Sequence, residues 1–101
     1  MNDLDLASTL EDLAAHRIEE LRFSLPGSGK YRDCAMYWAY EEYPALGKKA
    51  PSFLIVRLGK VGEIRFVKSI NPDLVRFSLP QGKLGLKDVW KKLEVTKIRR
   101  E

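Results

Sequence analysis

The chain has 101 residues, of which 45% are apolar and 32% are charged, and its formal net charge at pH 7 is +4. This composition is typical of one small globular domain covering residues 1–101, and it excludes an intrinsically disordered chain. Because no apolar run approaches the roughly 18 residues of a membrane-spanning helix, we expect no membrane partner.

The first element that the sequence predicts is an amphipathic helix over residues 9–20. Ser8 and Glu11 have the spacing of a capping box, in which each side chain bonds to the backbone amide of the other residue. Behind them the apolar residues recur every three or four positions, which is the period of a helix with one buried face. A short extended segment, residues 22–26, follows this helix.

The segment 33–43 is rich in tyrosine and ends before a proline. We predict a helix here, because Asp33 can cap its first turn and Met36, Tyr40 and Tyr43 share one helical face. Every second residue from 34 to 40 is also apolar or aromatic, so a strand remains the alternative.

Residues 52–79 carry β-branched and aromatic residues in period-two order, which predicts a three-stranded antiparallel meander. In its first hairpin we expect Val56 opposite Ile64 on the inner face and Arg57 opposite Glu63 on the outer face. The predicted inner face comprises Leu54, Val56, Leu58, Ile64, Phe66, Ile70, Val75, Phe77 and Leu79.

A further helix is predicted over residues 86–94, where Leu86, Val89 and Trp90 share a face. Residues 95–101 either extend this helix or form a short edge strand, and a basic tail is predicted over residues 96–101. The resulting fold class is α+β. We expect an antiparallel sheet of three to four strands that is covered on one face by the helices 9–20, 33–43 and 86–94.

The sequence Arg-Phe-Ser-Leu-Pro occurs twice, at residues 22–26 and 76–80, and each copy precedes a loop with glycine and lysine. The sequence leaves open whether this is a true duplication. The first loop lacks the spacing of a P-loop, and Tyr31 stands where that motif needs a hydroxyl ligand for magnesium. Lys30 and Lys83 can each hold an isolated phosphate, although solvated lysines in ordinary turns explain the same pattern.

Charge is distributed unevenly along the chain. Residues 1–47 contain four basic and nine acidic residues, whereas residues 48–101 contain fourteen basic and five acidic residues. This asymmetry favours a basic surface for a polyanion, unless the two halves fold together and neutralise each other. The predicted nucleic-acid site comprises Arg57, Lys60, Arg65, Arg76, Lys83, Lys87 and Lys91, with Phe53 available to stack on a base.

A second predicted surface is the tyrosine-rich segment 31–43. Tyrosine and tryptophan combine a large apolar area with a polar end, which protein interfaces favour. The candidate partner-binding residues are Tyr37, Trp38, Tyr40 and Tyr43.

We expect no enzyme, no cofactor and no metal site. The single cysteine, Cys34, and the single histidine, His16, lie far apart in the sequence, and no spacing matches a set of metal ligands. One cysteine cannot form an internal disulfide and the N-terminus lacks a secretory signal, which favours a cytoplasmic location. The sequence therefore predicts a small non-enzymatic binding module for DNA or RNA, with a protein inhibitor, adaptor or subunit as the alternative.

Overall fold

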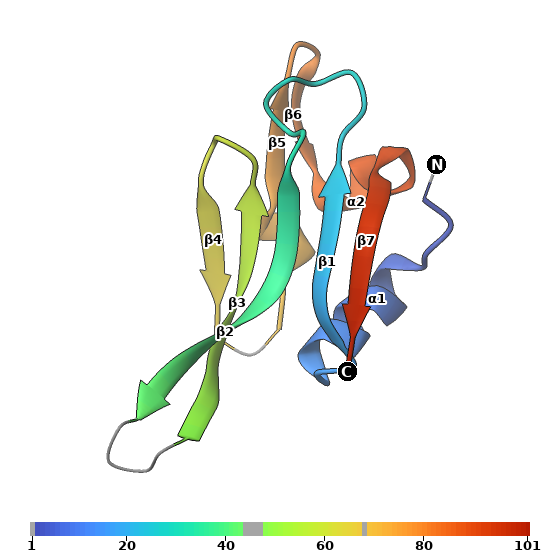
Figure 1. The fold of residues 1–101 in the computed structure, drawn as a ribbon. Helices are drawn as coiled ribbons and strands as arrows, with labels where there is room; N and C mark the ends of the chain where they lie inside the picture. The colour runs from blue at the N-terminus through green and yellow to red at the C-terminus, as the bar shows by residue number, and fades with distance from the viewer. Residues whose placement is uncertain (1, 44–47, 68) are drawn as a thin grey trace.

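The computed structural model describes residues 2–43, 48–67 and 69–101, with side chains described outside residues 41–52. The elements follow in the order α1 (Leu6–Ala14), β1 (Ile18–Ser24), β2 (Cys34–Tyr43), β3 (Lys48–Leu58), β4 (Glu63–Phe66), η1 (Pro72–Leu74), β5 (Arg76–Leu79), β6 (Gly82–Gly85), α2 (Leu86–Val89), η2 (Trp90–Lys92) and β7 (Glu94–Arg100). The antiparallel strands β4-β3-β2-β1-β7 form one sheet, and β5 and β6 form a separate two-stranded sheet (Figure 1).

The predicted fold class is wrong. The described chain is mostly sheet, and its α-helices are two short ones rather than three that cover a sheet. The core lies between the inner face of the five-stranded sheet and a second layer built from the β5–β6 hairpin and the helices. Leu13 of α1, Phe77 of β5 and Val89 of α2 are fully buried in this core.

The first helix begins and ends earlier than the sequence predicts. Asp5, not Ser8, caps α1, and its carboxylate accepts a hydrogen bond from the Ser8 amide at 2.9 Å. His16 has a left-handed backbone with φ of 62°. The amides of His16 and Arg17 bond back to the carbonyls of Leu13 and Asp12, so a Schellman motif ends the helix and β1 starts at Ile18.

The segment 33–43, predicted as a helix, forms strand β2 instead. It pairs with β1 on one side and β3 on the other, and Met36 and Trp38 are buried in the core. The alternating pattern prevails because aromatic residues suit a pleated, half-buried surface and both neighbouring strands bond the backbone. Asp33 precedes the strand and contacts Arg57 at 3.3 Å, rather than capping a helix.

The first hairpin of the predicted meander is confirmed, with Val56 opposite Ile64 and Arg57 opposite Glu63. The third strand is not part of this sheet. The short helix η1 turns the chain after Asn71, and β5 then pairs with β6. The predicted inner face is nevertheless buried or partly buried in one core, because Val75 and Phe77 contact that core from the second sheet.

The predicted helix over residues 86–94 is divided into α2 and η2, and it ends at Lys92. Residues 96–101, predicted as a basic tail, are basic and largely exposed, but all except Glu101 belong to β7. Val95 and Ile98 pack on the core while β7 pairs with β1. The C-terminal segment therefore completes one edge of the large sheet.

Candidate functional site

Three loops meet at one end of the large sheet: the β1–β2 loop, the β3–β4 turn and the β5–β6 turn (Figure 1). The first two line a pocket of about 450 Å³. Its lining contains four basic side chains and one carboxylate, and we call it the basic pocket: Gly29, Lys30, Arg32, Asp33, Arg57, Gly59 and Lys60.

Tyr31 holds the β1–β2 loop in place. This side chain is 1% exposed, and its ring packs edge-on against Phe77 with centroids 5.0 Å apart. Its hydroxyl accepts a hydrogen bond from the Ser78 amide at 2.8 Å, and its carbonyl accepts one from the Leu25 amide at 2.8 Å. Lys30 and Arg32, on either side of this anchor, are exposed.

Gly59 brings the β3–β4 turn against the same loop. Its φ is +57°, and a Cβ added to it would lie 2.1 Å from the Lys30 carbonyl oxygen. Any other residue would force the two segments apart, because this oxygen belongs to the backbone. The absence of a side chain at this position therefore allows Lys30 and Lys60 to line one pocket.

Cys34 lies directly beneath this contact and is fully buried. Burial raises the pKa of its thiol to about 11, although a hydrogen bond with the Gly59 backbone opposes this change. The thiolate form is therefore scarce at neutral pH, and the Cys34 side chain is packed in the core.

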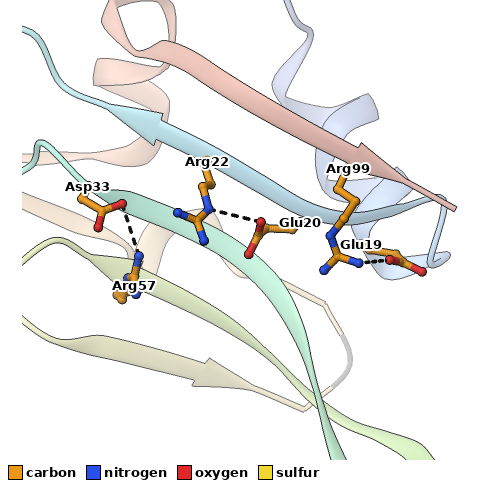
Figure 2. A network of polar contacts seen from close by, with 6 residues as sticks. All are labelled: Glu19, Glu20, Arg22, Asp33, Arg57 and Arg99. Atoms are coloured by element: carbon orange, nitrogen blue, oxygen red, sulfur yellow. Dashed lines mark hydrogen bonds and ion pairs between the residues drawn. The ribbon is translucent and has the colours of Figure 1, made fainter.

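The pocket is more basic than its surroundings. Arg57 contacts Asp33 at 3.3 Å in an exposed ion pair (Figure 2). Among the described residues, no carboxylate lies within ion-pair distance of Lys30, Arg32 or Lys60. Three exposed cations thus converge without a partner in the described part of the chain.

The outer face of the large sheet is close to electrically neutral. Arg22 pairs with Glu20 at 3.2 Å, and Arg99 pairs with Glu19 (Figure 2). Further along the face, Arg65 pairs with Glu63 at 3.0 Å, and its guanidinium also lies 4.9 Å from the centre of the Phe53 ring. Basic and acidic side chains therefore pair along this face, and of these three pairs Arg99–Glu19 joins the two halves of the chain.

The structure brings together only part of the predicted nucleic-acid site. Arg57 and Lys60 line the basic pocket, whereas Arg65 lies on the neutral face and Arg76 lies on β5 in the second sheet. The separation of Arg76 follows from the β5–β6 pairing that replaces the meander.

The three remaining predicted lysines are exposed on the second layer. Lys83 lies on β6 and Lys91 on η2, while Lys87 contacts Asp73 at 3.4 Å. Arg32 was not predicted as a site residue. The sequence does place Arg32 close to Lys30 in a glycine-containing loop. It does not show that the β3–β4 turn lies next to this loop.

The predicted partner-binding residues whose side chains the structure describes differ in how far they are exposed to solvent. Trp38 is only 9% exposed and stacks on His16 with ring centroids 3.9 Å apart, so it belongs to the core. Tyr37 is half-buried and Tyr40 is 46% exposed. The side chain of Tyr43 lies outside the described residues.

Comparison of the chain with protein-family models, with curated proteins and with solved structures finds no match. No group of three or more histidine, cysteine, aspartate or glutamate side chains in the described residues is placed to hold a metal ion. None of the helices in the described ranges is long and apolar enough to cross a membrane.

The contact at Gly59 leads to a testable prediction. Gly59→Ala should destabilise the protein more than Gly27→Ala, by at least about 1 kcal/mol in urea unfolding, because forcing an extra carbon into a packed site costs about this much. Both glycines have a left-handed backbone, with φ of +57° and +83°, so the intrinsic strain of about 1–2 kcal/mol is similar. Only at Gly59 does the added carbon meet backbone, because no atom lies within 4 Å of the carbon built at Gly27. Equal losses would show that the approach to Lys30 does not constrain the fold.

Proposed function

We propose that this protein is a non-enzymatic module that binds the phosphate backbone of nucleic acid at the basic pocket. The main support is the convergence of Lys30 and Arg32 from the β1–β2 loop with Arg57 from the end of β3 and Lys60 from the β3–β4 turn, around a pocket of about 450 Å³. One guanidinium group can donate two parallel hydrogen bonds to two oxygens of a phosphate, and a lysine ammonium adds a positive charge on a flexible side chain. A cytoplasmic location is part of the proposal, and the single buried cysteine, Cys34, is consistent with it.

The surroundings favour a chain of phosphates over a single ion. A neighbouring pocket shares Gly29 and Lys30 with the basic pocket and adds Lys92, so positive charge continues past the β1–β2 loop. The Arg57–Asp33 pair is exposed, and such pairs contribute at most about 1 kcal/mol. A phosphate can therefore replace Asp33 at the guanidinium of Arg57 at little cost.

Salt dependence tests the proposal. Arg32→Gln should weaken binding to a labelled oligonucleotide and should reduce the slope of log K against log salt by about 0.7–0.9, the contribution of one phosphate contact. The matched control is Arg100→Gln, which removes the same charge at the end of β7, at the opposite end of the sheet (Figure 1). Fluorescence anisotropy at several salt concentrations measures both slopes. Equal effects of the two variants, or no binding at low salt, would contradict the proposal.

A second candidate function is binding to a protein partner through Tyr40. In the described residues β2 pairs with β1 as far as Tyr37, and β3 pairs with β4 as far as Leu54. Beyond these positions the two strands continue as a ribbon that extends from the sheet (Figure 1). Tyr40 lies on this ribbon and is 46% exposed, as an interface anchor would be.

The protein-partner candidate predicts that Tyr40→Ala abolishes capture of a specific protein from nuclease-treated lysate without changing the unfolding curve. Val61→Ala is the matched control, because Val61 is 57% exposed and lies in the β3–β4 turn, at the end of this hairpin opposite the ribbon (Figure 1). If both variants capture the same proteins as the unmodified chain, Tyr40 is not an interface residue.

A further inference from the structure

The pocket that adjoins the basic pocket is larger, and its lining contains more apolar residues. Its volume is about 660 Å³, within the range of roughly 300–1,000 Å³ that small-molecule sites span. It lies between the β1–β2 loop and the β5–β6 hairpin, and it shares Gly29 and Lys30 with the basic pocket. Any ligand that fills both pockets therefore passes Lys30.

The two copies of Arg-Phe-Ser-Leu-Pro both contribute residues to the lining of this pocket. Leu25 and Pro26 end the first copy, and Leu79 and Pro80 end the second. In each copy a buried phenylalanine, Phe23 of β1 or Phe77 of β5, anchors the strand in the core. These four lining residues are apolar and follow closely on buried positions of β1 and β5, which suits a flat, uncharged group.

The polar groups of the pocket are few and carry no negative charge. Ser28, Ser78 and Gln81 supply hydroxyl groups and one amide, and Lys30 and Lys92 supply two positive charges. No carboxylate is among the residues that line it. An anionic ligand with one apolar, hydrogen-bonding face matches this combination.

We propose that this pocket receives one unpaired base of a single-stranded nucleic acid. The base packs on the apolar lining residues of the two copies, the Gln81 amide bonds to the base edge, and Lys30 and Lys92 bind the adjoining phosphates. A duplex does not fit this arrangement, because its bases are stacked and paired. The inference rests on the proposed function and specifies its ligand as single-stranded.

The test compares two labelled probes of equal charge. One is a single-stranded oligothymidylate of about ten nucleotides, and the other is a stable abasic analogue of the same length. If a base occupies the pocket, the unmodified protein should bind the first probe about tenfold more tightly or better, because each bound base adds to the affinity. Equal affinity for the two probes would overturn the base pocket while leaving the proposed function intact, whereas no binding to either at low salt would overturn both.

Substitutions of lining residues test whether the base binds in this pocket. The double substitution Pro80→Ala with Gln81→Ala should lower affinity for oligothymidylate at least fivefold and leave affinity for the abasic probe unchanged. Both residues are exposed in a turn, so folding should be preserved. Lys30→Gln should instead weaken binding to both probes alike, because it removes a phosphate contact.

The matched control is Val61→Ala, which shortens an exposed apolar side chain in the β3–β4 turn, outside this pocket. It should leave the ratio of the two affinities unchanged. If the unmodified protein prefers oligothymidylate and the double variant retains that preference in full, the base binds elsewhere and the assignment of this pocket is wrong.

Discussion

The docking of the β1–β2 loop onto β5 and the β3–β4 turn is the interaction on which the proposed binding end depends. Tyr31 is buried against Phe77 and bonded to the Ser78 amide, so it fixes the loop to the second layer. Gly59 then lets the neighbouring turn approach the Lys30 carbonyl. Because a buried residue alternates with exposed neighbours, the same contact that stabilises the loop directs Lys30 and Arg32 towards solvent. Stability and charge placement thus have one structural origin.

The net charge of +4 says little about where a polyanion binds. The acidic and basic halves of the chain are in contact where Arg99 of β7 pairs with Glu19 of β1 and Arg100 of β7 lies 4.0 Å from Asp12 of α1. These exposed pairs add little to the free energy of unfolding, but each places a negative charge beside a basic side chain. The basic pocket keeps its charge because Asp33 is the one carboxylate among its lining residues.

The sequence predicts contacts that depend on local pattern. Apolar residues at every second position, together with a glycine turn, place Val56 opposite Ile64. The same alternation of apolar and polar residues predicts that Phe77 is buried, as it is in the structure. The sequence does not predict the state of residues 33–43, because tyrosine and tryptophan fit an amphipathic helix or a strand until β1 and β3 supply partners on both sides. The basic pocket was missed for a related reason: Lys30 and Lys60 are brought together by Tyr31 and Gly59, whose packing no local pattern shows.

The most direct test of the central claim, that the clustered loops at one end of the sheet bind nucleic acid, is backbone amide chemical-shift mapping with a short single-stranded oligonucleotide. The shifts should concentrate in residues 26–33, 57–60 and 78–84, which line the two pockets or lie next to them. Shifts concentrated instead around Arg22, Arg65 and Arg99 would place binding on the open sheet face and would contradict the claim.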